Sequence, residues 1–425
     1  MLIHVVRPGE TLYAIAGRYG ADPELLRTAN GVPDSGALAV GQTLVIQPVE
    51  TFHVVQPGQT LSGVARLYGV SLRQLYRNNY GLEGRPALRP GQTLVIAYDE
   101  ERLGTVSTNG YAYPFISPEE LGATLPYMSY LTPFTYGIDQ EGGLLPLDDG
   151  ALLAEARRLG AAPLMHLSTL TEAGQFSSQR AASLLEDPAR QAALTDQVLA
   201  TIAEKDYQGL DVDFEYLPAA LREAYASFIT ALRERLAPLG LPVLAALAPK
   251  TRPDQPGLLY EAHDYALLGA AADYVLLMTY EWGYTYGPPM AVAPLPNVRQ
   301  VLDYAVTVIP REKIYLGIPN YGYDWPLPFV QGETRARSIS NQEAVAIAVA
   351  NGAEIQFDER AQSPWFRYTR EGVEHQVWFE DARSMSAKLR LIQEYGLWGA
   401  GYWNLMRPYP QGWTVLNALY RVRDL

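Results

Sequence analysis

The chain is expected to fold as an α/β protein: a (β/α)₈ TIM barrel with a small α+β insertion between its strands 7 and 8, preceded by two βααβ modules. Three features support this assignment. A segment near the N-terminus occurs twice, eight apolar runs alternate with helical segments beyond residue 104, and one of these runs carries regularly spaced acids. The 425 residues also exceed what one typical domain needs.

The first part of the chain contains an internal repeat. The sequence HVVRPGETL at residues 4–12 recurs as HVVQPGQTL at residues 53–61, and GQTLVI at residues 41–46 recurs at residues 91–96. Two copies in the same order indicate a duplicated structural unit. The spacing differs by one residue before the last block, so a loop has accepted one insertion.

Each copy is predicted to form a strand, two helices and a second strand. A short apolar strand is followed by a Pro-Gly turn, Thr11 can cap the first helix, and Gly20 suits its left-handed end, as do their counterparts in the second copy. The modules are expected at residues 1–48 and 51–97. The short, charged segment 98–104 is then a linker.

Residues 105–425 alternate between strand-like and helical patterns. The predicted strands are Thr108–Phe115, Tyr127–Thr135, Ala162–Ser168, Gly209–Glu215, Pro242–Ala248, Tyr274–Tyr280, Lys313–Tyr321 and Gly399–Asn404. The clearest predicted helices are Asp149–Leu159, Pro188–Glu204, Ala219–Leu236 and Ser384–Tyr395. Eight such strands favour a closed barrel over an open α/β sheet. Residues 323–378 are too many for one connection and predict the α+β insertion at one rim of the barrel.

The fourth strand carries three acids on one face. In the segment Gly209–Tyr216, Asp211, Asp213 and Glu215 alternate with apolar residues, and a strand sends every second side chain to the same side. Like charges at close range resist ionising together, so the acids are expected to share a proton. Glu215, at the end of the strand, is therefore a candidate general acid. The alternative is a calcium or magnesium site, but a strand places the acids in a row rather than around an ion, so no metal is expected.

Other barrel strands also end in polar or aromatic residues. Reactive groups of such barrels lie at the C-terminal ends of the strands. The ends of the sixth, seventh and eighth strands therefore supply further candidates: Tyr280, Trp282, Asn320, Tyr321 and Trp403.

The composition excludes several classes of function. A net charge of −13 argues against nucleic-acid binding, and the lack of cysteine excludes disulfides and thiolate metal sites. No signal peptide and no membrane span are visible. No cofactor is expected, and the protein is expected to be a monomer. The 29 tyrosines and 7 tryptophans fit sugar binding, although the count alone favours ordinary packing.

The repeated units resemble LysM domains, which bind glycans that contain N-acetylglucosamine. The resemblance rests on the Pro-Gly-(Glu/Gln)-Thr-Leu segment and on the closing Gly-Gln-Thr-Leu-Val-Ile segment, present in both copies. It implies a sugar groove between the loop after the first strand and the loop before the second. The residues that it places there are Pro8, Gly9, Glu10 and Thr11, and Pro57, Gly58, Gln59 and Thr60. The alternative is that one module is only a spacer.

The remainder of the chain resembles glycoside hydrolase family 18. The family signature ends Asp-Gly-x-Asp-x-Asp-x-Glu, and residues 208–215 read QGLDVDFE, with Gln208 in place of the first acid. Met278–Tyr280 matches the Met-x-Tyr of the sixth strand, followed by Glu281 where many members have Asp. Trp403 matches the tryptophan of the eighth strand. Two LysM units before this barrel most resemble bacterial spore cortex-lytic N-acetylglucosaminidases.

The resemblance implies substrate-assisted, retaining hydrolysis, in which the acetamido oxygen of the substrate attacks its own anomeric carbon. Glu215 would protonate the leaving oxygen, Asp213 would bind the acetamido N–H, and Asp211 would share a proton with Asp213. Tyr280 would position the acetamido oxygen, and Trp403 would form the floor of the subsite. For the remaining candidates, packing is as good an explanation as sugar contact: Trp282, Asn320 and Tyr321.

The expected substrate is therefore peptidoglycan or another N-acetylglucosamine polymer, cut at β-1,4 bonds. The resemblance favours a spore or cell-wall location, with the modules binding the glycan. Two alternatives are a chitinase and a non-catalytic wall-binding or chitin-binding protein. The intact Glu215 weighs against the second alternative.

Overall fold

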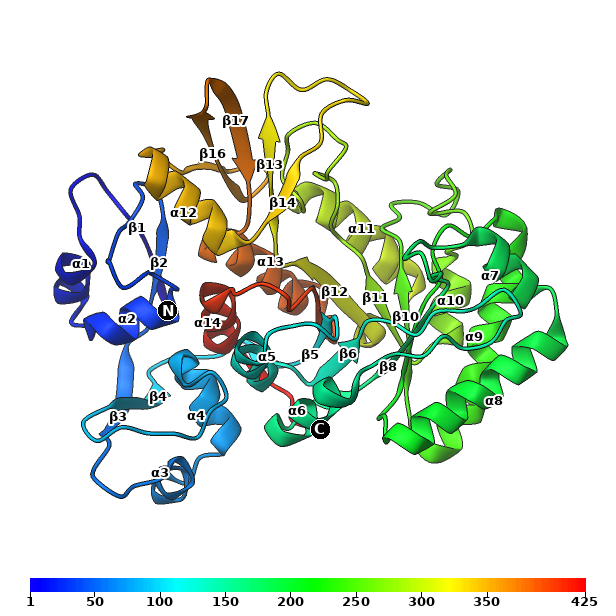
Figure 1. Ribbon diagram of the computed structural model, residues 1–425, viewed down its shortest axis with the longest axis horizontal. Helices are drawn as coiled ribbons and strands as arrows, with labels where there is room; N and C mark the ends of the chain where they lie inside the picture. The colour runs from blue at the N-terminus through cyan, green and yellow to red at the C-terminus, as the bar shows by residue number, and fades with distance from the viewer.

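The two copies of the N-terminal repeat form two similar modules, each with two helices packed on a two-stranded antiparallel sheet. The computed structural model describes residues 1–425 (Figure 1). The first module contains β1 (Leu2–Val5), α1 (Leu12–Tyr19), α2 (Pro23–Ala29) and β2 (Thr43–Ile46). The second contains β3 (Val49–Val54), α3 (Leu61–Tyr68), α4 (Leu72–Asn78) and β4 (Thr93–Tyr98).

The expected helix caps are present in both modules. The Thr11 hydroxyl accepts a hydrogen bond from the backbone N–H of Ala14, and the Thr60 hydroxyl accepts one from Gly63. The first helices end at Gly20 and Gly69 with φ of 64° and 67°, a conformation that glycine adopts without a steric penalty. Local sequence signals therefore set the boundaries of these short helices.

A closed barrel of eight parallel strands follows. Its strands are β5 (Gly104–Ala112), β6 (Tyr130–Pro133), β7 (Ala162–Pro163) with β8 (Met165–Ser168), β9 (Leu210–Asp213), β10 (Val243–Leu247), β11 (Tyr274–Leu277), β12 (Ile314–Pro319) and β18 (Gly399–Trp403). The third barrel strand is interrupted at Leu164, so β7 and β8 are two parts of it. The N–H of Tyr136 donates to the carbonyl of His166, and the N–H of Ser168 donates to that of Tyr136, both at 2.9 Å. These bonds join the second strand to the third and close the barrel, as the sequence predicts.

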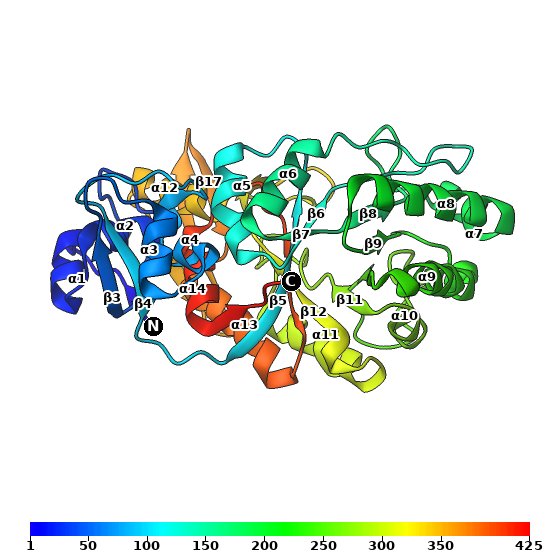
Figure 2. The ribbon, with the colours of Figure 1, turned by 90° about the horizontal axis from the view of Figure 1, so that it is seen from below.

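Helices surround the barrel (Figure 2). They are α5 (Pro118–Thr124), α6 (Gly150–Leu159), α7 (Ser178–Leu185), α8 (Pro188–Lys205), α9 (Arg222–Leu236), α10 (Tyr265–Ala271), α11 (Leu295–Val308), α13 (Ala382–Tyr395) and α14 (Pro410–Leu419). A last strand, β19 (Tyr420–Val422), pairs with the start of β5. Apolar side chains of the strands and helices form one continuous core between the two layers. None of the helices combines the length and the apolar character that a membrane crossing requires.

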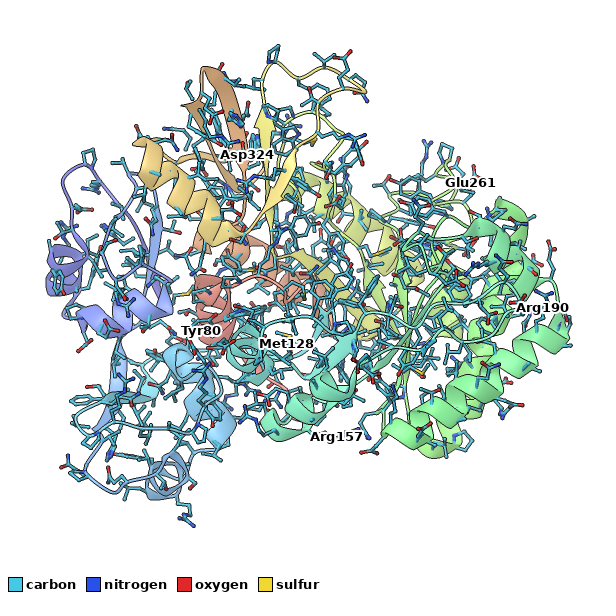
Figure 3. The ribbon with its side chains drawn as sticks, viewed as in Figure 1. Tyr80, Met128, Arg157, Arg190, Glu261 and Asp324 are labelled. Carbon is cyan, nitrogen blue, oxygen red and sulfur yellow. The ribbon has the colours of Figure 1, made fainter.

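The insertion between the seventh and eighth barrel strands is a five-stranded antiparallel sheet with one helix. The strand order is β14 (Arg337–Ile339), β13 (Gly322–Pro326), β17 (Val373–Trp378), β16 (Ser363–Arg370) and β15 (Gln356–Asp358), and the helix is α12 (Asn341–Asn351). Ile339, Ala344, Phe366 and Val377 form part of its own small core. Asp324, labelled in Figure 3, lies on β13 and accepts hydrogen bonds from Tyr368 and His375 across the sheet.

Candidate active site

A cavity of about 730 Å³ opens at the C-terminal ends of the barrel strands. It combines two carboxylates of the fourth strand with a wall that is mostly aromatic. Its lining includes Tyr111, Tyr113, Phe134, Phe176, Asp213, Glu215, Tyr216, Tyr260, Met278, Tyr280, Glu281, Trp282, Tyr284 and Trp403. A space of this size and character is suited to a small polar ligand with apolar faces, such as a sugar.

The alternation along β9 produces the acidic face. Leu210 and Val212 join the core between barrel and helices, while Asp211 and Asp213 belong to the opposite face, inside the barrel. Both aspartates are buried. Neither carboxylate oxygen of Asp211 has a hydrogen-bond partner, and one oxygen of Asp213, Oδ1, has none either. Buried oxygens without partners are unfavourable as carboxylates, so the site favours their protonated forms.

The pKa values follow from this burial. Burial raises the pKa of Asp211 to about 7, with the neighbouring Tyr111 hydroxyl acting in the opposite direction. Burial, followed by the charges of Glu215 and Asp211, raises the pKa of Asp213 well above its usual range. Burial, followed by the charge of Glu281, raises the pKa of Glu215 to about 7. The cluster therefore holds protons near neutral pH, which a general acid requires.

His166 on β8 is a neighbour of the acids that the sequence did not reveal. Its Nε2 lies 3.8 Å from Oδ2 of Asp213, and its Nδ1 lies 2.5 Å from the hydroxyl of Thr135. Burial lowers the pKa of His166 to about 3, so its ring is neutral and supplies no cation to ionise Asp213. In the pairing of β8 with β9, His166 lies opposite Asp211, so a correct prediction of this pairing would have placed His166 beside the acids.

Glu281 approaches the acids from the end of the sixth strand. Its carboxylate accepts hydrogen bonds from the hydroxyls of Tyr321, at 2.5 Å, and Tyr323, at 2.9 Å. Burial raises the pKa of Glu281, and these two hydroxyls partly oppose the rise. Because Tyr323 belongs to β13, the insertion helps to hold a carboxylate of the cavity wall.

Aromatic rings surround the predicted tryptophan of the eighth strand. The ring centroid of Trp403 lies 4.9 Å from that of Phe134, edge to face, and 5.6 Å from that of Tyr111. Tyr113 and the exposed Phe115 stack 5.2 Å apart beyond it. These four residues were not among the predicted contacts. Tyr111 lies near the end of β5, and the other three follow β5 or β6, so their places at strand ends are the signal that could have identified them.

Two of the predicted sugar contacts do not line the cavity. The Asn320 side chain is buried, and its Nδ2 donates to the carbonyls of Asn404 and Arg407, both at 2.9 Å. Asn320 therefore joins the ends of the seventh and eighth strands through its Nδ2, while its buried Oδ1 has no partner. The Tyr321 hydroxyl is used by Glu281. By contrast, Tyr280, Trp282 and Trp403 do line the cavity.

The polar side chains predicted to bind glycan in the N-terminal modules are largely engaged within their own loops. Glu10 accepts from the N–H of Arg7 at 3.0 Å and pairs with His4 and Arg18. In the second module, Gln59 accepts from the N–H of Gln56 at 2.8 Å and contacts His53. Thr11 and Thr60 cap helices, so all four polar side chains already have partners within their own modules. The remaining predicted positions are exposed: Pro8, Gly9, Pro57 and Gly58.

These features define a glycoside-hydrolase barrel, and comparison with known proteins identifies the family. Residues 169–407 match the model for glycosyl hydrolases family 18, and residues 4–47 and 53–97 match the LysM domain. The chain belongs to glycosyl hydrolases family 18 and is a glycosidase with two LysM domains. No group of three or more His, Asp or Glu side chains is arranged to hold a metal ion.

Full-length relatives share the whole arrangement. The chain is 40% identical to the cortical fragment-lytic enzyme of Bacillus subtilis over 435 residues, which covers 99% of each chain. The crystal structure of the Bacillus cereus spore cortex-lytic enzyme SleL matches with a TM-score of 0.84 and 34% identity, covering 100% of this chain and 98% of that one. The Bacillus megaterium spore cortex-lytic enzyme SleL matches with a TM-score of 0.83 and 35% identity, covering 100% and 99%.

Proposed function

We propose that this glycosidase cleaves β-1,4 N-acetylglucosaminyl bonds of spore cortex peptidoglycan, and that cortical fragments are its preferred form of substrate. The names of the full-length relatives support the choice of polymer, and the name of the Bacillus subtilis relative supports the choice of fragments. The two LysM domains support attachment to a glycan. The protein acts as a monomer in the spore, in contact with the cortex.

The single observation that carries the proposal is the buried cluster of acids at the mouth of the barrel. Glu215 lines the cavity, and its pKa of about 7 allows it to hold a proton under near-neutral conditions. It donates this proton to the leaving glycosidic oxygen as the bond to the anomeric carbon breaks. As a carboxylate, it then accepts a proton from the water that attacks the intermediate.

The nucleophile in this proposal is the acetamido oxygen of the substrate, as in the substrate-assisted class of glycosidases. Asp213 accepts a hydrogen bond from the acetamido N–H, and its unpartnered Oδ1 supports that role. The expected sharing of a proton between Asp211 and Asp213 needs a hydrogen bond between their carboxyl groups, and the structure has none. In this proposal Asp211, two residues earlier on β9, acts through its charge, which raises the pKa of Asp213 and keeps the two acids from ionising together. The hydroxyl of Tyr280, which also lines the cavity, positions the acetamido oxygen.

The aromatic wall holds the sugar in place. Trp403, supported by Phe134 and Tyr111, covers the apolar face of the reacting sugar, and Trp282 contacts a neighbouring sugar. Tyr113 and Phe115 extend this surface beyond the mouth of the cavity. Asn320 and Tyr321 have no direct sugar contact in this proposal.

Mass spectrometry of the products released from purified cortical fragments tests the proposal. We expect new reducing N-acetylglucosamine ends with the wild-type chain and none with Glu215→Gln. Colloidal chitin is digested in parallel as a competing polymer. Absence of new reducing N-acetylglucosamine ends, or faster release from chitin than from the fragments, would overturn the assignment of the substrate.

A further inference from the structure

The two LysM modules differ in what covers the loop between the second helix and the second strand. The segments Ser35–Gly41 and Arg85–Gly91 are counterparts, and both contain Ala-Leu at the same place. In the first module, Ala39 and Gly41 are buried. In the second, the counterparts Arg89 and Gly91 are exposed, and so is Pro90 between them.

The insertion covers this loop in the first module. The backbone N–H of Ile355 donates to the carbonyl of Val40 at 2.9 Å. A Cβ atom added at Gly41 would lie only 1.9 Å from the carbonyl oxygen of Ile355. The side chain of Arg383, at the start of α13, also reaches the carbonyl of Gly41, at 3.4 Å. The backbone carbonyls of Val40 and Gly41 therefore face protein rather than solvent, whereas Ser35 and Ala37 of the same loop line a cavity between the first module and the insertion.

Buried polar contacts hold the first module in that position. The side-chain amide of Gln411, on α14, donates to the carbonyl of Thr43 at 2.8 Å and accepts from the Thr43 hydroxyl at 2.9 Å. The Thr414 hydroxyl donates to the carbonyl of Ala29 at 2.8 Å. Buried hydrogen bonds of this kind are costly to break because their atoms would be left without partners.

The second module is attached through a different surface. Arg73 and Arg77 of α4 are buried and donate to the carbonyl of Pro126 at 3.1 and 2.6 Å, and Arg77 also pairs with Asp424 at 2.7 Å. This attachment leaves the last residues of the loop before β4, Arg89 to Gly91, exposed to solvent. A Cβ atom added at Gly91 would meet nothing within 4 Å.

The opposite wall of the expected groove is equally open in both modules. Pro8 and Gly9 are exposed, as are Pro57 and Gly58, and neither glycine has an atom within 4 Å of an added Cβ. The exposure of this wall is therefore the same in both modules, and the difference in exposure lies in the other wall. In the first module that wall is covered by the insertion, and in the second it faces solvent.

We propose that the second LysM module alone binds the N-acetylglucosamine polymer, and that the first is a structural brace packed against the insertion and the barrel helices α13 and α14. The proposal deepens the proposed function and depends on it for the identity of the glycan. One working module is sufficient to keep the enzyme on an insoluble polymer, because it raises the local concentration of substrate bonds. The first module then contributes to the stability of the assembly rather than to affinity.

Matched glycine substitutions test the difference in binding. Gly9→Tyr and Gly58→Tyr each place a ring in the exposed wall, at φ of 81° and 82°, so their backbone penalties are the same. The full chain, made inactive by Glu215→Gln, is sedimented with purified insoluble peptidoglycan. We expect Gly58→Tyr to weaken binding by about tenfold or more and Gly9→Tyr by less than about twofold. Equal losses, a larger loss with Gly9→Tyr, or no loss with either would overturn the proposal.

A second pair of variants tests the brace. Gly41→Ala and Gly91→Ala have φ of 84° and 85°, so the direct backbone cost of each is similar, but only Gly41 faces Ile355. We expect Gly41→Ala to lower Tm by several degrees more than Gly91→Ala; equal Tm values would contradict the docking. Hydrolysis of soluble cortical fragments by the wild-type chain is measured separately, so that failure of the proposed function and failure of this inference remain distinguishable.

Discussion

Carboxyl groups in the barrel and in the first LysM loop have opposite surroundings. Glu10 accepts a hydrogen bond from the N–H of Arg7 and pairs with His4 and Arg18, and the Arg7 N–H, followed by the His4 side chain, lowers its pKa to about 2. Asp211 has no partner for either oxygen, and burial raises its pKa to about 7. One acid is held as a carboxylate and the other as a carboxylic acid.

This contrast separates acids that stabilise a loop from acids that are available for chemistry. A carboxylate with partners on both oxygens has little acceptor capacity left for a ligand. A buried carboxyl group without partners destabilises the fold, so it is retained where a reaction uses it. Residue type alone does not distinguish the two, but the pattern of partners does.

The largest expected effect is on turnover. Glu215→Gln removes the proton that the leaving oxygen receives while keeping the shape of the side chain. We expect hydrolysis of soluble cortical fragments to fall by about 100- to 10,000-fold. The rate is measured from newly formed reducing ends. Glu10→Gln makes the same chemical change in the LysM loop and is the control. If Glu215→Gln kept about a tenth of the wild-type rate, the contrast between the acids of the barrel and the acid of the LysM loop would not hold.

The next effect is on stability. Because the folded-state pKa of Asp211 lies above the ordinary value of 3.8, its contribution to folding is complete below about pH 4 and is lost as the pH rises towards 7. Asp211→Asn cannot ionise, so this loss disappears. Between pH 4 and pH 7, we expect the free energy of unfolding of Asp211→Asn to fall by on the order of 3 kcal/mol less than that of the wild-type chain. Urea unfolding at both pH values measures it. Parallel pH dependence in the two proteins would show that Asp211 is not held protonated.

A smaller effect concerns the pH profile. The charge of Glu281 contributes to the raised pKa of Glu215, so Glu281→Gln is expected to lower that pKa. The alkaline limb of kcat/KM then moves to lower pH by roughly one unit or less. Glu333→Gln, exposed on the insertion, is the matched control and should leave the limb in place. A shift to higher pH with Glu281→Gln would mean that Glu281 does not act through its charge.

The smallest effect is expected in the LysM loop. Glu10→Gln places in the first module the residue that Gln59 already provides in the second, where it makes the equivalent contacts with Gln56 and His53. Only the pair with Arg18 is lost. We therefore expect thermal unfolding to change little. A fall in Tm as large as that caused by Gly41→Ala would show that the charge of Glu10, and not its hydrogen-bond pattern, holds the loop.

The sequence was sufficient for the barrel, the repeat and the acids because each has a local pattern. The acids of β9 stand out through their period of two, and the modules through their duplication. Tyr111 and Phe134 lack such a pattern, since they are two among many aromatic residues, and only their places at strand ends point to the site. Asn320 was expected near a sugar because of its place at a strand end, yet its side-chain amide donates to the backbone carbonyls of Asn404 and Arg407.

Long-range contacts explain the remaining differences. The bond between Tyr323 and Glu281 depends on how the insertion folds back over the barrel. The covering of Val40 by Ile355 joins residues that are far apart in the chain, and nothing in either segment indicates it. Equivalent sequences in the two modules therefore predicted equivalent grooves, whereas the structure distinguishes them by their surroundings.

The pH dependence of kcat/KM for the wild-type chain on soluble cortical fragments tests the central claim most directly. If the protonated Glu215 is the donor, the rate falls with an apparent pKa of about 7 as the pH rises, and this limb is absent from any residual rate of Glu215→Gln. A wild-type rate that stays constant from about pH 6 to pH 9 would contradict the account, since a donor with this pKa loses its proton within that range.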